Sequence, residues 1–73
     1  MHPLAKRFGR TLRRLRLEAG LSQETLADEA KLHRNYVGLL ERGERMPTIL
    51  VVQMLADALG TTMSKMLKEV DGR

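Results

Sequence analysis

The stretch QETLADEAKLHRNYVGLLER, residues 23–42, has the pattern of a short helix, a tight turn and a second short helix. Ser22 before it is a good N-cap for the first helix, and residues 31–32 form the turn. Each helix has one apolar side, and together these sides contain Leu26, Ala27, Ala30, Leu32, Val37 and Leu40. The small side chain of Ala27 lets two helices cross steeply without being pushed apart. The stretch therefore predicts two short helices that cross closely over a tight turn.

The second of these helices carries polar groups on the side that faces away from the core. A short helix held on the outside of a compact support can enter the major groove of DNA and show its outer residues to the base edges. Arginine can donate two hydrogen bonds to guanine, and asparagine suits adenine. The candidates for base contacts are the residues on the outer side and flank of this helix, namely Arg34, Asn35, Tyr36, Gly38 and Leu39.

Most of these candidates also have a plainer interpretation. Arg34 could equally bind a phosphate, and Tyr36 is equally well explained as a half-buried packing residue. Leu39 could meet a thymine methyl group, although single exposed leucines are common. Gly38 costs a helix about 1 kcal/mol against alanine, a cost that closer approach of the backbone to DNA would offset. Asn35 points straight outward, so a merely solvated role is its weaker interpretation.

Three further helices are predicted around this unit. Residues 4–19 carry apolar side chains at helical spacing, and Gly20 stands in the position of a helix end. Thr48 caps a helix that Gly60 stops, and Thr62 caps a last helix that continues to about residue 70. No segment alternates between polar and apolar residues as a strand does. The predicted fold is therefore all-α, a compact bundle of five short helices in one domain over residues 1–73.

The composition limits the classes of function. The chain has 73 residues, 42% of them hydrophobic, and no cysteine, so we expect one small domain without disulfides or thiolate metal sites. The N-terminus lacks a long apolar run, so we expect no signal peptide, no membrane span and a cytoplasmic location. His2 and His33 are too far apart for a zinc site. The chain lacks a Ser/His/Asp set and a phosphate-binding glycine loop, so we expect no enzyme activity and no cofactor.

Positive charge is concentrated in two segments. The formal net charge is +4, with six bases against one acid in residues 1–20 and four bases against two acids in residues 31–45. Residues 21–30 hold three acids and no base, and the charges balance from residue 46 onward. Basic segments of this kind suit a polyanion such as DNA, although basic residues can also simply solvate helix faces.

The stretch GLSQETLADEAKLHRNYVGLLERGERMPTILVVQMLADALG, residues 20–60, resembles the Cro/lambda-repressor-type (XRE-type) helix-turn-helix family. The resemblance is carried by Leu21-Ser22-Gln23, Leu26-Ala27, Glu41-Arg42-Gly43, the Pro47 loop, and Leu55-Ala56 with Leu59-Gly60. Residues 33–45 are similar to the recognition region of controller proteins of restriction-modification systems. The resemblance implies a lambda-repressor-like DNA-binding domain and a transcriptional regulator. One departure is Lys31, where the family often has glycine; a left-handed lysine would cost about 1 kcal/mol.

The resemblance also implies roles for residues around the two helices. In the family, the glutamine that matches Gln23 bonds a DNA phosphate, helped by backbone N–H groups at the helix start. The other candidates for phosphate or minor-groove contacts are Ser22, His33, Arg42 and Arg45, of which His33 is also the expected N-cap of its helix. The family commonly pairs an arginine of its first helix with the glutamate that ends its third, here Arg16 and Glu41. We interpret that pair as structural, because an unpaired charge on the inner side would be costly.

We expect a homodimer on two-fold symmetric double-stranded DNA, because one short helix reads too few base pairs to find a site in a genome. The expected interface is an apolar stripe on the last helix, residues 62–70, formed by Met63, Met66, Leu67 and Val70. The same stripe could instead only close the core of one chain. The sequence indicates no small-molecule ligand. The alternative function is an antitoxin-type protein-interaction module that also binds DNA.

Overall fold

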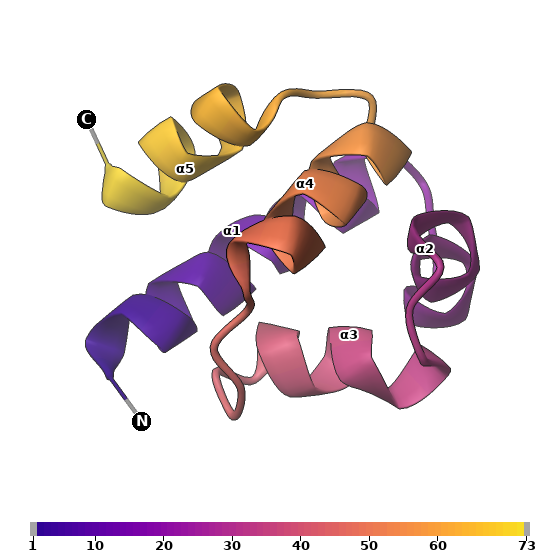
Figure 1. Ribbon diagram of the computed structural model, residues 1–73, viewed down its shortest axis with the longest axis horizontal. Coiled ribbons are helices and arrows are strands. Elements are labelled where there is room, and N and C mark those ends of the chain that lie inside the picture. Colours follow the sequence, from indigo (N-terminus) through magenta and orange to yellow (C-terminus); the bar gives the residue numbers. More distant parts are fainter. Residues whose placement is uncertain (1, 73) are drawn as a thin grey trace.

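Five helices follow one another along the chain in the computed structural model, which describes residues 2–72 (Figure 1). They are α1 (Pro3–Glu18), α2 (Gln23–Ala30), α3 (Arg34–Glu41), α4 (Ile49–Ala58) and α5 (Met63–Asp71). No strand forms within the described residues, and the predicted all-α fold is confirmed. Each helix in residues 2–72 is too short or too polar to cross a membrane.

Each helix starts at a side chain that caps its first turn. Ser22, Thr48 and Thr62 accept a hydrogen bond from the backbone N–H three residues further on, at 3.0, 3.1 and 3.1 Å. His2 and His33 use Nδ1 to accept from the N–H two residues further on. These caps supply acceptors to N–H groups that have no partner inside the helix. The starts of α2 to α5 therefore lie at the residues that the sequence predicts.

Lys31 joins α2 to α3 in the left-handed conformation, with a φ of 59°. Among the described residues other than glycine, it alone has a positive φ. The next residue, Leu32, donates its N–H to the carbonyl of Ala27 at 2.8 Å, which closes the turn. Lysine in place of the glycine that is common in the family therefore keeps the turn tight. The left-handed conformation of Lys31 is strained.

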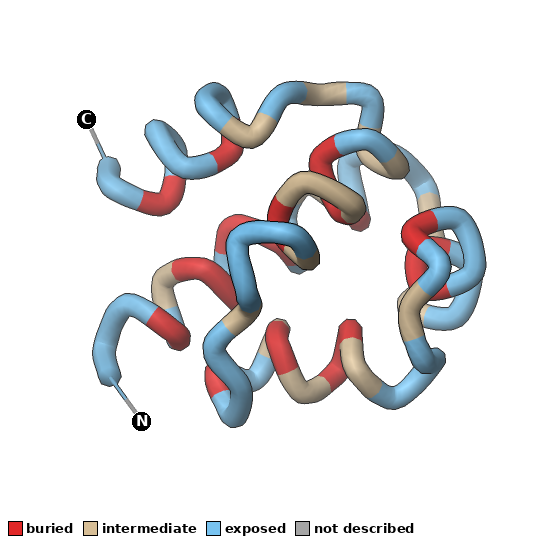
Figure 2. The backbone as a smooth tube through the Cα atoms, viewed as in Figure 1, coloured by how far each residue is buried: buried red, intermediate tan, exposed pale blue. Residues whose placement is uncertain are grey.

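The core lies where the five helices meet. The large side chains that are buried completely are Leu12, Leu26, Val37, Leu40, Leu55 and Met66, so that every helix contributes at least one. In Figure 2 the buried stretches of the helices face the middle of the molecule. Ala27 is also fully buried, and α2 and α3 contact each other closely. The small residue thus lies where the sequence predicts a close helix crossing.

α5 closes the core of the single chain. The apolar stripe that we expected at a dimer interface is therefore largely buried in its own chain. Met66 is fully buried, Val70 is nearly so, and Met63 is half-buried against the same core. The reason is that α5 packs on both α1 and α4, so its apolar side faces those helices. Of the four residues, Leu67 remains exposed, at 37%. Met66 is therefore out of reach of a second copy, whereas Leu67 and Val70 line a groove on the surface.

We predict that Lys31→Gly stabilises the protein by about 0.5–1 kcal/mol, because glycine adopts the left-handed conformation without a steric cost. Part of the gain is lost, since glycine is more flexible in the unfolded chain. Urea denaturation measures the free energy of unfolding. Lys31→Ala is the control, because it removes the same charge and keeps the strained Cβ. An equal gain from Lys31→Ala would contradict a conformational cause.

Candidate nucleic-acid interface

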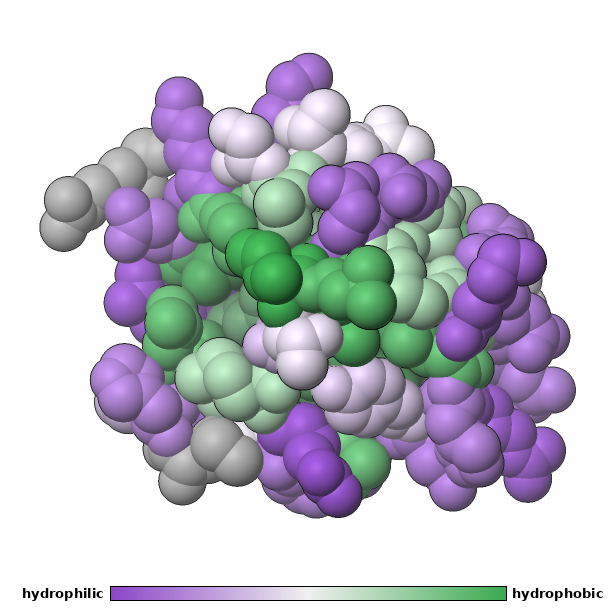
Figure 3. Space-filling model, viewed as in Figure 1, coloured by the Kyte–Doolittle hydropathy of each residue, from purple (hydrophilic) through white to green (hydrophobic). Residues whose placement is uncertain are grey.

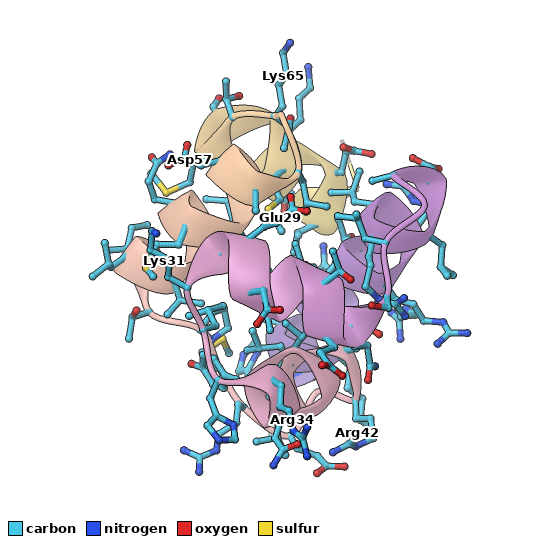
Figure 4. The ribbon with its side chains drawn as sticks, turned by 90° about the vertical axis from the view of Figure 1, so that its right-hand side faces the viewer. Glu29, Lys31, Arg34, Arg42, Asp57 and Lys65 are labelled. Carbon is cyan, nitrogen blue, oxygen red and sulfur yellow. The ribbon has the colours of Figure 1, made fainter. Side chains whose placement is uncertain are left out.

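α3 presents its polar side at one end of the molecule. Arg34 and Asn35 are exposed in its first turn, and Arg42 is exposed directly after its last residue. In Figure 4, Arg34 and Arg42 point away from the other helices at this end, whereas Lys65 points outward at the opposite end. Tyr36 is half-buried and packs against the core, as its plainer interpretation predicts.

A shallow groove of about 350 Å³, here called the polar groove, runs along this end of the molecule. It is lined by Gln23, Arg34, Asn35, Gly38, Leu39 and Arg42. The structure thus brings together four of the five candidates for base contacts and two of the five candidates for phosphate or minor-groove contacts. The lining is mainly polar, which suits hydrogen bonding to a nucleic acid better than burial of an apolar ligand.

Gly38 lines the polar groove on the outer side of α3, and side chains around it leave it buried. A Cβ atom there would stand 3.1 Å from Nη1 of Arg42 and 3.4 Å from Oε1 of Gln23. The absence of a side chain therefore gives these two residues room to lie over α3. Glycine costs the helix about 1 kcal/mol against alanine, and here it leaves space for the side chains of Gln23 and Arg42.

Behind the polar groove, Arg16 and Glu41 form an ion pair with two hydrogen bonds. Nε of Arg16 donates to Oε2 of Glu41 at 2.6 Å, and Nη2 donates to Oε1 at 3.1 Å. Nη1 donates to the backbone carbonyl of Leu21 at 2.9 Å. The two charged side chains are only 8% and 3% exposed. The hydrogen bonds to Glu41 raise the pKa of Arg16 above its ordinary value.

Gln23 connects the polar groove to this ion pair. Its Nε2 donates at 3.0 Å to Oε1 of Glu41, the oxygen that also accepts from Arg16. This bond fixes the amide and leaves its second N–H for another acceptor. Gln23 is the first residue of α2, where backbone N–H groups also lack partners inside the helix. The start of α2 can therefore hold a phosphate oxygen.

The other three candidates for phosphate or minor-groove contacts, Ser22, His33 and Arg45, do not line the polar groove, whereas Arg42 does. Ser22 and His33 are exposed, and capping already uses one acceptor atom of each. Nε of Arg42 donates to Oε2 of Glu44 at 2.9 Å, in a pair whose side chains are both more than half exposed. Such an exposed pair contributes little, so Arg42 can exchange its partner for a phosphate. Arg45 is exposed and forms no ion pair within residues 2–72.

Two close backbone contacts are not predicted from the sequence. A Cβ atom at Gly9 would stand 2.3 Å from the carbonyl oxygen of Leu40 and 2.5 Å from that of Glu41, so α1 meets the end of α3 backbone to backbone. Gly43 has a φ of 73°, and a Cβ atom there would stand 2.6 Å from Cγ of Lys6. The sequence does contain a signal for the first contact. Gly9 stands inside a helical pattern, where glycine weakens the helix, so its presence indicates a close packing contact.

These features define a class of protein. Two short helices cross over a tight turn, the second shows hydrogen-bonding side chains outward, and a buried ion pair holds it against α1. This is the arrangement of a helix-turn-helix DNA-binding domain. Residues 12–66 match the model of the family described as helix-turn-helix. The chain therefore belongs to the helix-turn-helix family of DNA-binding transcriptional regulators, and the predicted resemblance is confirmed.

Its relatives include controller proteins. The chain is 32% identical over 72 residues to the control protein C.MunI of a Mycoplasma species, covering 97% of both chains. It is 35% identical over 68 residues to the uncharacterized HTH-type transcriptional regulator y4dJ of Sinorhizobium fredii, covering 93% of this chain and 88% of the relative. The crystal structure of the restriction-modification controller protein C.AhdI from Aeromonas hydrophila superposes with a TM-score of 0.82 at 44% identity, covering 85% of this chain and 94% of that chain.

We predict that Arg16→Met and Glu41→Gln each destabilise the protein by about 3–5 kcal/mol, because each leaves a buried group without its counter-charge. Thermal melts followed by circular dichroism measure the loss. Arg14→Met is the matched control, because Arg14 forms exposed pairs with Glu18 and Glu69 and its loss should shift the melting temperature only slightly. Near-native melting of both Arg16→Met and Glu41→Gln would exclude a stabilising buried pair.

Proposed function

We propose that the protein is a sequence-specific transcriptional regulator that binds a palindromic operator as a homodimer, in the role of a restriction-modification controller protein. The observation that carries the proposal is the polar groove, which gathers Arg34 and Asn35 of α3 with Gln23 and Arg42. Groups able to read bases thus lie on one surface with groups able to bind phosphates. Similarity to C.MunI and C.AhdI supports the controller role.

In the proposed complex, α3 lies in the major groove of the operator. Arg34 donates to O6 and N7 of a guanine, and Asn35 bonds N6 and N7 of an adenine. Leu39, half-buried in the polar groove, contacts a thymine methyl group. Gln23 and Arg42 bind phosphates, which fix the register in which the bases are read. The proposal includes no catalytic step and no cofactor, because hydrogen bonding and charge suffice for this role.

A second surface supports the homodimer. Large apolar side chains gather over α4 and the neighbouring parts of α1 and α5, and Figure 3 shows green atoms across the middle of this face. They surround a groove of about 180 Å³, here called the apolar groove, lined by Leu4, Phe8, Met46, Pro47, Ile49, Val52, Leu67 and Val70. Ile49 is 68% exposed. A second copy of the chain would cover this surface with its own.

The size of the reading surface is a further reason for a symmetric pair. α3 has eight residues, and one short helix contacts only a few base pairs. A two-fold pair would place two copies of α3 in successive major grooves, roughly 34–36 Å apart. The pair would also double the net charge of +4 that each chain brings to the DNA. Both effects strengthen binding to a palindromic site.

For base reading, we predict that Arg34→Ala weakens binding to the preferred sequence by about 1–3 kcal/mol and relaxes the preference at one base pair. Gln23→Ala should instead weaken binding to all sequences alike, because a phosphate contact carries no sequence information. In vitro selection of bound DNA from a random pool, repeated with each variant, measures both effects. An unchanged selected motif for Arg34→Ala would make Arg34 a phosphate contact, against its proposed role.

For the homodimer, we predict that Ile49→Asp and Leu67→Asp each convert a dimer into a monomer, because each places charge in an apolar contact that is repeated by symmetry. Analytical ultracentrifugation over a range of protein concentrations measures the mass. Leu17→Asp is the matched control, because Leu17 is 53% exposed on α1 and does not line the apolar groove. A wild-type chain that stays monomeric at high concentration would contradict the homodimer and favour a different protein in the apolar groove, as in an antitoxin.

A further inference from the structure

α5 neutralises part of the positive charge on the outer side of α1. Nη2 of Arg7 donates to the backbone carbonyl of Asp71 at 2.9 Å and lies 3.8 Å from Oδ1 of the same residue. Arg14 forms ion pairs with Glu69 of α5 and with Glu18 one turn further along α1, the latter at 3.1 Å. The bases on the side of α1 that faces α5 are therefore already paired.

Lys6, Arg10 and Arg13 form a second group, here called the α1 stripe. They stand four and then three positions apart, a spacing that places them on one side of the helix over two turns. All three are exposed, and within residues 2–72 none of their side chains forms an ion pair. Like charges at this spacing repel one another. The described chain therefore does not compensate the charge of the α1 stripe.

The α1 stripe begins beside the loop that follows α3. The stem of Lys6 packs on Gly43, since a Cβ atom there would stand 2.6 Å from Cγ of Lys6. Arg42 and Arg45 lie on either side of Gly43 in the sequence and are exposed. One turn further along α1, Gly9 touches the carbonyl groups at the end of α3. The basic surface next to the polar groove thus continues onto α1.

Arg10 and Arg13 lie close enough together to line one shallow hollow, with Arg14, Leu17 and Glu18. The carboxylate of Glu18 is bonded to Arg14, so it does not neutralise the other two arginines. Long basic side chains can cover a helix with their aliphatic stems while their charged groups stay in water. Two neighbouring guanidinium groups of this kind suit an anion that repeats along a line, as the phosphates of DNA do.

We propose that the α1 stripe is a second contact to the DNA backbone, separate from the polar groove, which binds phosphates of the duplex that flanks the sequence read by α3. This inference rests on the proposed function, because binding at the polar groove brings the flanking duplex to the molecule. The three cations extend over two helical turns, so their partner carries several negative charges in a row. Phosphate contacts release counterions whatever the base sequence. The stripe therefore adds affinity for longer DNA and leaves the preferred sequence unchanged.

The salt dependence of binding to two duplexes tests this inference. One duplex contains only the selected operator, and the other extends it by about one helical turn, roughly ten base pairs, on each side. For Arg10→Gln/Arg13→Gln, the slope of log K against log salt concentration should become shallower by about 0.9 per lost contact, on the long duplex only. Arg10→Lys/Arg13→Lys keeps both charges and should keep the wild-type slope. The selected motif should be the same for all three proteins.

Lys65→Gln/Lys68→Gln is the charge-matched control, because both lysines belong to α5 and Lys65 points outward at the end opposite to Arg34 (Figure 4). An equal change of slope in this control would reveal a general charge effect and overturn the inference. An unchanged slope for Arg10→Gln/Arg13→Gln would also overturn it, in favour of an acidic protein surface as the partner. A wild-type protein that selects no sequence would overturn the proposed function itself, and this result is seen before any variant is compared.

Discussion

The buried ion pair between Arg16 and Glu41 is the constraint on which the rest of the structure depends. α3 has eight residues, too few to hold a helix alone in water. The pair joins the last residue of α3 to α1, and the same guanidinium holds the carbonyl of Leu21 before α2. The ion pair thus joins α1, the end of α3 and the segment before α2. Because charged hydrogen bonds are directional, they hold α3 in one orientation toward the solvent.

The polar groove takes its geometry from this ion pair. Glu41 accepts a hydrogen bond from Gln23, so the start of α2 stays at a fixed place beside α3. Gly38 then leaves the space in which Gln23 and Arg42 lie. A charge that serves folding therefore also positions groups of the polar groove. For this reason, stability and binding cannot be separated at Glu41, whereas they can be separated at Arg34, which is exposed and touches none of these groups through a hydrogen bond.

The sequence predicts those parts of the fold that depend on neighbouring residues. The helix starts at Ser22 and Thr62 are predictable because each cap acts on an N–H group three residues away. The partners Arg16 and Glu41 stand 25 residues apart, so helical spacing cannot pair them and only the family resemblance does. The outer side of α3 follows from helical spacing. The burial of Gly38 does not, because it depends on where the side chains of another helix and of the following loop come to rest.

Sequence patterns do not predict where α5 packs. Its position determines which residues are exposed on two surfaces, the apolar groove and the outer side of α1. An apolar stripe predicts that one side of a helix is buried, but it does not distinguish burial in the same chain from burial in a second copy. In the fold, α5 buries Met66, leaves Leu67 at the apolar groove and brings Glu69 to Arg14. Its acids neutralise the adjacent bases of α1 and leave the α1 stripe uncompensated. The packing of this one helix therefore separates an apolar surface, suited to a second copy, from a basic surface suited to DNA.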